Sequence, residues 1–218
     1  MNLSLFSPLA AFTQRQQSLL RHLLAKSDGC TADELALYLG ISRSAVDQQL
    51  KNLERDSYVE KYQRASTGGR PSYAFRLTSD GIHLFPKHYG MFSNVLLTLI
   101  KDKSGDEALQ DYMTGLGSSL AQQFKQRITG MDDSARMTQV AQLMQELGYE
   151  AEALPESDSE PAEICARNCV YHHLADQHAE VCQLDLALLG DLLGKEVEQT
   201  ECMVREGSVC RFRIKNEN

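Results

Sequence analysis

The chain has 218 residues, of which 42% are hydrophobic and 24% charged, a composition typical of globular proteins. This length allows two modest domains, each with its own core. The longest apolar run, Leu35 to Leu39, is far shorter than the roughly 20 residues of a membrane span, and the N-terminus lacks the basic and apolar regions of a secretory signal. We therefore expect a cytoplasmic protein with reduced thiols and no membrane partner.

The net charge of −8 is unevenly distributed along the chain. Residues 13–83 contain ten Lys/Arg and eight Asp/Glu, a balance of +2, and the remainder contains twelve and twenty-two, a balance of −10, which together give −8. DNA phosphates repel the acidic part and tolerate the other. Any contact with nucleic acid is therefore predicted for the first part of the chain.

The first part has the element order of a winged helix-turn-helix domain. Thr31, followed three residues later by Glu34, forms a capping-box pattern, and Gly40 is typical of a helix end. Ser42 is placed to cap the third helix. The leucine spacing and the turn residues predict helices over 15–26, 32–39 and 43–53, and strands over 58–62 and 73–77 joined by the turn-rich residues 66–71.

In such a domain the second helix of the helix-turn-helix unit enters the major groove, and the wing contacts the backbone or the minor groove. Arg43 is suited to a bidentate contact with guanine and Gln48 to reading adenine, while Lys51 is placed for a phosphate. The side chains predicted to contact a double-stranded DNA operator are Ser42, Arg43, Ser44, Gln48 and Lys51 from the helix, with Arg64 and Arg70 from the wing.

The second part reads as a mixture of helices and strands. A helix over about 84–102 is expected to lead away from the winged domain, and the amphipathic helix over 107–129 is expected to link or pair subunits, or else to pack in the core. The other predictions are helices over 134–147, 169–177 and 184–193, an acidic loop over 154–163, and strands over 197–203 and 209–214.

Five of the six cysteines fall in the last 54 residues: Cys165, Cys169, Cys182, Cys202 and Cys210. Zinc sites usually use closely spaced cysteine pairs, and only Cys165 with Cys169 resembles one, whereas iron–sulfur clusters accept varied spacing. Soft thiolates suit either group, so ligand type leaves both possible. Buried free cysteines, and a reversible disulfide that needs no metal, are the other interpretations. Nearby arginines, Arg167, Arg205, Arg211 and Arg213, could offset the charge of such a site or lie on the solvated surface.

The residues around these cysteines resemble a known family. The segments are NCVYHHLA over 168–175, HAEVC over 178–182, ECM over 201–203 and CRF over 210–212. They look like the C-terminal region of SufR-type regulators, which are iron–sulfur-cluster-bearing winged-helix repressors related to the DeoR and ArsR groups. The second part is also similar to the 4-vinyl reductase type of domain, an α/β fold that holds a small molecule or a metal.

The resemblance implies a homodimer that holds a cluster through Cys169, Cys182, Cys202 and Cys210. A [4Fe-4S] cluster is favoured and a [2Fe-2S] cluster is possible. Cys165 departs from the family pattern, and it or a histidine (His172, His173 or His178) could replace Cys202 as the fourth ligand. Many regulators of this family repress genes of cluster assembly while the cluster is present.

The sequence thus predicts an α+β protein with a winged helix-turn-helix domain over 13–83 and a C-terminal α/β cysteine-rich domain over 84–218 that dimerises and senses. The function expected is regulation of transcription, with DNA binding that depends on the cluster; the genes would be those of cluster assembly, redox or stress. The alternative is a zinc-stabilised or thiol-redox regulator that senses a small molecule or an oxidant. An enzyme is not expected, because the chain lacks a nucleotide-binding glycine fingerprint, a P-loop and an HExxH motif.

Overall fold

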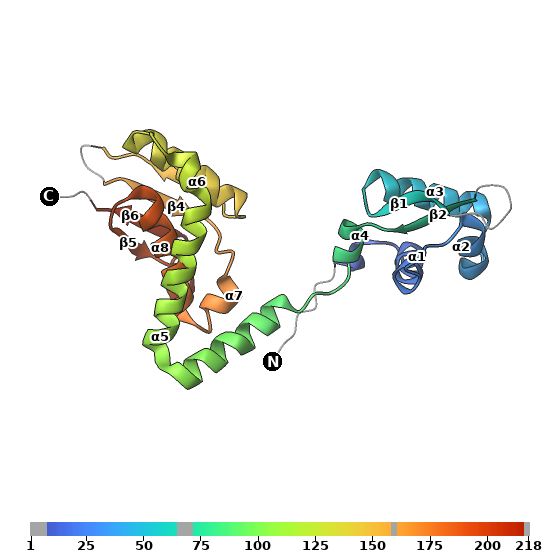
Figure 1. The fold of residues 1–218 in the computed structure, drawn as a ribbon, viewed down its shortest axis with the longest axis horizontal. Helices are drawn as coiled ribbons and strands as arrows, with labels where there is room; N and C mark the ends of the chain where they lie inside the picture. The colour runs from blue at the N-terminus through green and yellow to red at the C-terminus, as the bar shows by residue number, and fades with distance from the viewer. Residues whose placement is uncertain (1–7, 65–71, 158–160, 216–218) are drawn as a thin grey trace. The chain divides into compact units, whose positions relative to one another are not determined.

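The structure is a computed structural model, and it describes residues 8–64, 72–157 and 161–215. The chain divides into two compact units, residues 1–88 and 89–218, each with its own core. The two units are coloured blue to green and green to red in Figure 1. Helices and strands occur in both, which confirms the α+β class.

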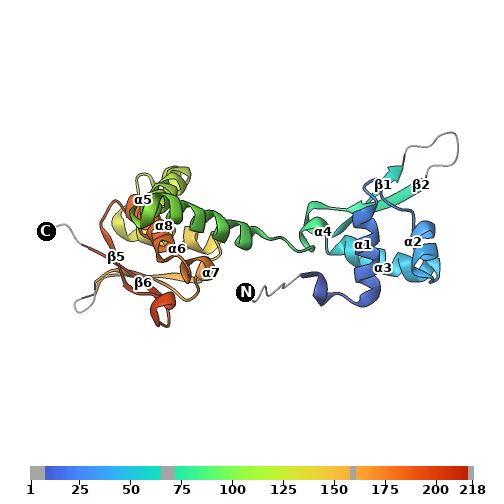
Figure 2. The same ribbon diagram turned by 90° about the horizontal axis from the view of Figure 1, so that it is seen from below.

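The N-terminal unit has three helices followed by a two-stranded antiparallel hairpin (Figure 2). Its elements are η1 (Pro8–Ala11), α1 (Gln14–Ala25), α2 (Ala32–Leu39), α3 (Arg43–Arg55), β1 (Val59–Arg64), β2 (Ser72–Leu77) and α4 (Ser79–His83). The predicted order of elements is therefore confirmed, with shifts of one or two residues at their ends.

Local capping fixes where these helices begin and end. The Thr31 side chain accepts a hydrogen bond from the backbone of Glu34, whose carboxylate accepts one from the backbone of Thr31, so the predicted capping box is present. Ser42 caps α3 through Ala45, as predicted. Gly40 ends α2 in the left-handed conformation, which glycine adopts without steric cost.

The core of the N-terminal unit is formed where the apolar faces of the three helices meet the hairpin. Cys30 forms an isolated bridge with Phe75 of β2 and is buried, as expected of a small core residue. The fully buried large side chains are Leu9, Leu19, Leu20, Leu23, Leu35, Leu50 and Leu53. Since this core is complete within the unit, the exposed face of α3 remains available for function.

The C-terminal unit packs helices against a four-stranded antiparallel sheet with the order β3-β4-β6-β5. Its elements are α5 (Tyr89–Ile128), α6 (Asp133–Glu146), β3 (Ala151–Leu154), β4 (Glu163–Ala166), α7 (His172–Ala175), η2 (Ala179–Val181), α8 (Cys182–Leu193), β5 (Val197–Glu201), η3 (Met203–Arg205) and β6 (Cys210–Ile214). Figure 2 shows α5, α6 and α8 on one side of the sheet. Strands β3 and β4 were missed by the sequence analysis, because each has only four residues, too few for a clear alternation.

Helix α5 joins the two helices predicted over 84–102 and 107–129. It starts at Tyr89 and bends at Gly105, whose φ of 86° is non-helical (Figure 1). Beyond the bend, its apolar side packs on α8, where a Cβ on Gly117 would lie 2.3 Å from the carbonyl oxygen of Leu184. Of the two roles predicted for residues 107–129, core packing holds for the side that faces α8. Tyr112 and Leu116 remain exposed on another side.

The two faces of the sheet differ in chemistry. Ile164, Phe212 and Ile214 belong to the core, and strand pairing places Ala166 opposite Cys210 on the same face. The other face has Cys165 opposite Arg211 and Glu163 opposite Arg213. The alternation of strand side chains thus separates Cys165, which lies in β4, from Cys210.

Candidate cysteine site and nucleic-acid interface

Four cysteines come from four separate segments of the C-terminal unit. Cys169 follows β4, Cys182 is the first residue of α8, Cys202 follows β5 and Cys210 is the first residue of β6. Their thiols interact with one another, so they occupy one neighbourhood. These are the four residues that the resemblance implies as ligands.

The thiols are hydrogen-bonded in two pairs. Cys169 and Cys210 are in hydrogen-bond contact, and this contact lowers the pKa of Cys169 while it raises that of Cys210. Cys182 is paired with Cys202, and burial, followed by the neighbouring Cys202, raises the pKa of Cys182 to about 12. The interaction of Cys182 with Cys169 and Cys210 connects the two pairs.

Backbone N–H groups point at two of the sulfurs. The N–H of Tyr171 donates to the sulfur of Cys169, and the N–H of Met203 donates to that of Cys210. The carbonyl of Cys202 accepts bonds from the backbone of Arg205 and of Gly207, at 3.0 and 2.9 Å, which folds the Cys202–Cys210 segment into a tight turn. N–H···S bonds stabilise thiolates and are found around metal-bound sulfur.

A buried acid lies beside the thiols. The Tyr149 hydroxyl donates to Asp185 at 2.5 Å, and burial raises the pKa of Asp185 to about 6 in spite of this bond. Asp185 in turn raises the pKa values of Cys182 and Cys210. Thiolates here would therefore repel one another and this carboxylate unless a cation compensated them.

The remaining cysteine of the unit and two of the arginines take no part in this group. Cys165 lies on the opposite face of the sheet, and Arg211 pairs there with Glu163 at 3.2 Å and with Glu201 at 3.5 Å. Arg213 also pairs with Glu163, at 3.4 Å. Of the two alternatives for these arginines, the structure favours surface charge for Arg211 and Arg213, because the strand alternation directs them to the other face.

The donor set has the chemistry of a sulfur-ligated group. Four thiols, three of them buried, with N–H bonds to two sulfurs are the kind of donors that soft metals and iron–sulfur clusters take. Within the described residues, no three His, Cys, Asp or Glu side chains are grouped as a bound metal ion requires. Ligand chemistry therefore leaves zinc and a cluster as alternatives.

The histidines have different surroundings. His172 and His173 lie at the start of α7 with their rings 6.0 Å apart, while His178 is buried. His178 Nε2 hydrogen-bonds to Asn94 Oδ1 of α5 at 2.9 Å and lies 3.4 Å from Thr98 Oγ1. Its Nδ1 has no hydrogen-bond partner among the described residues.

Besides the contact of Asn94 with His178, a second contact joins α5 to the segment before Cys182. Lys101 of α5 is ion-paired with Glu180 at 2.7 Å, two residues before Cys182. The segment immediately before Cys182 is therefore attached to α5 at Asn94 and Lys101, which are about two helical turns apart. We call these two contacts, Asn94–His178 and Lys101–Glu180, the α5–η2 clamp.

In the N-terminal unit, α3 presents the predicted contact residues to solvent. Ser44, Gln48 and Lys51 are exposed and recur at three- and four-residue spacing, so they share one face opposite the buried Val46 and Leu50. The next turn of this face carries an exposed arginine, Arg55, which was missed by the sequence analysis. The helical period starting from Lys51 could have identified it.

Acidic residues of α2 hold two of the predicted arginines. Arg43 pairs with Asp33 at 2.5 Å, and Arg64 with Glu34 at 3.5 Å. These exposed pairs are weak, so phosphates or bases can replace the carboxylates. Ser42 uses its hydroxyl as the cap of α3, and Arg70 lies outside the described residues.

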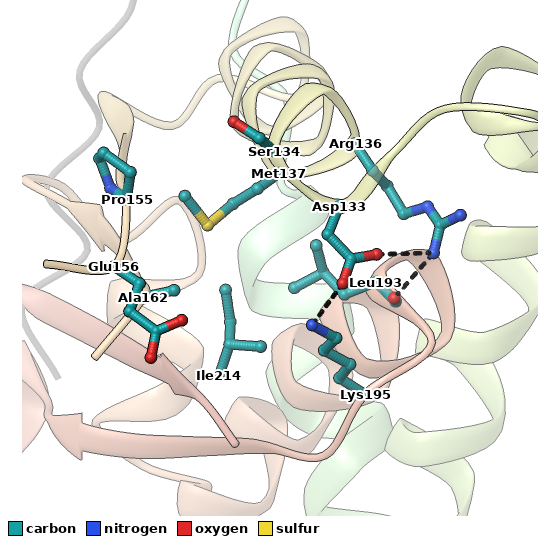
Figure 3. A pocket seen from close by; sticks show the side chains of 10 residues that line it. All are labelled: Asp133, Ser134, Arg136, Met137, Pro155, Glu156, Ala162, Leu193, Lys195 and Ile214. Atoms are coloured by element: carbon teal, nitrogen blue, oxygen red, sulfur yellow. Dashed lines mark hydrogen bonds and ion pairs between the residues drawn. The ribbon is translucent and has the colours of Figure 1, made fainter. Parts of the chain in front are cut away.

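The C-terminal unit also contains a pocket of about 300 Å³, which none of the cysteines lines (Figure 3). Met137, Leu193 and Ile214 form apolar walls. Charged side chains at its edge are paired, with Lys195 2.6 Å and Arg136 3.8 Å from Asp133. The pocket therefore offers a small apolar volume bordered by polar groups, as ligand pockets commonly do.

Comparison with known proteins finds a likeness for the N-terminal unit. Residues 13–71 match the model of the MarR family, and the chain matches no curated protein. This segment is therefore similar to the MarR family, whereas the resemblance found in the sequence points to the DeoR and ArsR groups.

Among solved structures, the chain is similar to a MepR mutant from a multidrug-resistant Staphylococcus aureus clinical isolate, with 27% identity, 51% of this chain and 80% of that chain covered, and a TM-score of 0.32. For the S. aureus MepR–DNA complex the identity is 27%, 51% of this chain and 80% of that chain are covered, and the TM-score is 0.31. For a possible transcriptional regulator from Methanosarcina mazei Go1 the identity is 17%, 46% of this chain and 86% of that chain are covered, and the TM-score is 0.30. TM-scores below 0.5 do not establish a shared overall fold. Within the described residues, no helix is long and apolar enough to cross a membrane.

Proposed function

We propose that the chain is a homodimeric, DNA-binding regulator of transcription whose C-terminal unit holds an iron–sulfur cluster through Cys169, Cys182, Cys202 and Cys210. The observation that carries this proposal is the meeting of four thiols from segments whose cysteines are separated by 12, 19 and 7 residues. A structural core would not require thiols at all four positions, because small apolar side chains would fill the same space.

Ligand roles follow from the surroundings of each sulfur. Cys169 and Cys210 already accept backbone N–H bonds, which favour their thiolate forms. Cys182 is buried beside the buried Cys202 and its pKa is raised, so Cys182 would release its proton only when a cation is present. When bound, a cluster supplies positive iron to these four sulfurs and a redox-sensitive link between their segments.

The α5–η2 clamp gives the site a route to the DNA-binding unit. Cys182 begins α8 and directly follows η2, which is attached to α5 through His178 and Glu180. The chain enters α5 from the winged unit after residue 88. A change at Cys182 that moves η2 therefore also moves the helix through which the winged unit is attached.

DNA binding is proposed from α3, whose exposed face carries Ser44, Gln48, Lys51 and Arg55. Arg43 and Arg64 would leave Asp33 and Glu34 to contact DNA. The match of residues 13–71 to the MarR family supports this role. Replacing Lys51 with Ala is expected to reduce the slope of log affinity against log salt by about 1, because one phosphate contact is lost.

The test is iron and sulfide analysis of protein purified without oxygen, with operator binding measured in parallel. Cys169→Ser and Cys182→Ser are expected to lose iron and cluster-dependent operator affinity, while Cys165→Ser and Cys30→Ser serve as matched controls that keep both. Wild-type protein that carries stoichiometric zinc would contradict the cluster and support the zinc-stabilised alternative. Protein that has neither metal after reconstitution would support the thiol-redox alternative.

A second candidate function is suggested by the pocket in Figure 3. It is lined by Leu193, at the end of α8, and Ile214, at the end of β6; these two elements begin with Cys182 and Cys210. A small, mainly apolar molecule bound there would act on the same two elements as the thiols. Met137→Trp, which fills the volume, is expected to abolish a ligand-induced shift in unfolding temperature but to leave the iron content unchanged.

A further inference from the structure

Helix α5 exposes an apolar face before its bend. Large apolar side chains in this segment have exposed fractions of 68% for Tyr89, 67% for Phe92, 44% for Leu96 and 48% for Leu99, and Met91 and Val95 are exposed beside them. Soluble proteins rarely leave so many large apolar groups together in solvent without a partner. The segment of residues 89–104 is about 24 Å long at 1.5 Å per residue.

The spacing of these residues identifies the kind of partner. Tyr89, Phe92, Leu96 and Leu99 are separated by three, four and three residues, which is the a and d spacing of a heptad repeat. Lys103 takes the next such position, and the helix then breaks at Gly105. An apolar seam of this kind is complementary to a second copy of itself.

The opposite face of the same segment is already occupied. Asn94 and Lys101 are seven residues apart and make the two contacts of the α5–η2 clamp, and Leu97 between them is buried. The clamp therefore fixes which side of the helix faces outward. The apolar seam points away from its own unit because the polar side is held by His178 and Glu180.

Charge argues against other partners. Residues 89–100 contain no Lys, Arg, Asp or Glu, although 24% of the chain is charged. Nucleic acid and anionic membranes are bound through basic side chains, which this face lacks. A second copy meets it without desolvating a charge, and a two-fold pair of identical faces is the commonest way in which soluble proteins dimerise.

We propose that residues 89–100 of α5 pair with the same segment of a second copy, in parallel, to form the dimer interface. The parallel direction rests on the proposed function, because it brings the winged units of both copies, which precede residue 89, to the same end of the pair. Two recognition helices can then face two half-sites of one operator. The surface itself does not depend on whether a cluster is bound.

The first test is the double variant Phe92→Glu/Leu99→Glu in the full chain, studied by sedimentation equilibrium. The dissociation constant of the dimer is expected to rise at least about 100-fold, because two apolar anchors on each copy are replaced by like charges. Both side chains are exposed, so helical content and iron content should remain those of the wild type. The matched control is Tyr112→Glu/Leu116→Glu, an exposed pair of the same helix beyond Gly105, which should keep the dimer.

The second test is cross-linking of Tyr89→Cys with a short bismaleimide without oxygen, with wild-type protein as the background. Position 89 lies at the end of the segment, so only parallel pairing places its two copies together and gives a covalent dimer, and Leu116→Cys should give none. A dimer that cross-links only at position 116, or one that Phe92→Glu/Leu99→Glu leaves intact, would overturn the proposal. It would also be overturned if the wild type were monomeric and bound phosphatidylglycerol/phosphatidylcholine vesicles through this face.

These results can be separated from those that test the cluster. Loss of iron in Cys182→Ser with a retained dimer would leave this interface standing, whereas loss of the dimer in Phe92→Glu/Leu99→Glu with normal iron would support it. A dimer unaffected by that double variant, together with normal iron and operator binding, would refute the interface alone.

Discussion

The two units of the chain are specified in different ways. The winged unit is built from local signals, such as the Thr31–Glu34 capping box, the Ser42 cap and the Gly40 helix end, and most of its predicted DNA-contact residues lie within a few turns of one helix. The cysteine site is instead assembled from four segments spread from Cys169 to Cys210. Local structure is therefore sufficient to place the first site, whereas the second requires the whole sheet and helix arrangement.

Separate cores imply that each unit should respond to its own core substitutions. Leu109→Ala in the C-terminal unit and Leu20→Ala in the N-terminal unit each remove a fully buried side chain and should cost about 3 kcal/mol. We expect Leu109→Ala to reduce the stability of the cysteine unit and Leu20→Ala to reduce the stability of the winged unit. Differential scanning calorimetry of both variants measures this, and one shared transition that shifts equally in both would contradict the comparison.

The buried carboxyl of Asp185 should make the metal-free cysteine unit depend on pH. Because the folded pKa of about 6 lies above the usual 3.8, the folded state binds the proton more tightly, and this stabilisation is complete below about pH 4 and lost as the pH rises through 6. Asp185→Asn should therefore gain about 3 kcal/mol relative to the wild type between pH 4 and pH 7.5, measured by urea unfolding.

The matched control for this experiment is Asp191→Asn, an exposed acid of the same helix. It should unfold like the wild type at both pH values. Equal pH dependence in Asp185→Asn and in the wild type would show that Asp185 titrates normally, and the low-dielectric setting inferred for the thiol group would then be wrong.

The smallest expected effect tests the local signals of the winged unit. Thr31→Ala removes the side-chain acceptor for the backbone of Glu34 and should cost about 1 kcal/mol. Thr31→Ser keeps the acceptor and should cost less. Urea unfolding followed by the signal of the winged unit measures both, and a cysteine unit that lost stability in Thr31→Ala would show that the two units are not independent.

The sequence by itself determined the winged helix-turn-helix order, its caps and the solvent face of α3, because each depends on contacts within about four residues or on helical period. The choice of Cys169, Cys182, Cys202 and Cys210 as ligands came only through a resemblance to a family and not from spacing, and it stays a prediction. The sequence could not separate Cys165 from the others, because that distinction depends on the face of β4 to which each side chain points.

Tertiary structure decided the rest. The short strands β3 and β4 exist because β6 pairs with β4, which no local pattern in four residues can indicate. The pairing of Arg211 with Glu163, the burial of Asp185 beside the thiols and the α5–η2 clamp all depend on contacts between residues far apart in the chain. Such contacts depend on how the sheet and helices pack together, so they cannot be predicted from local sequence patterns.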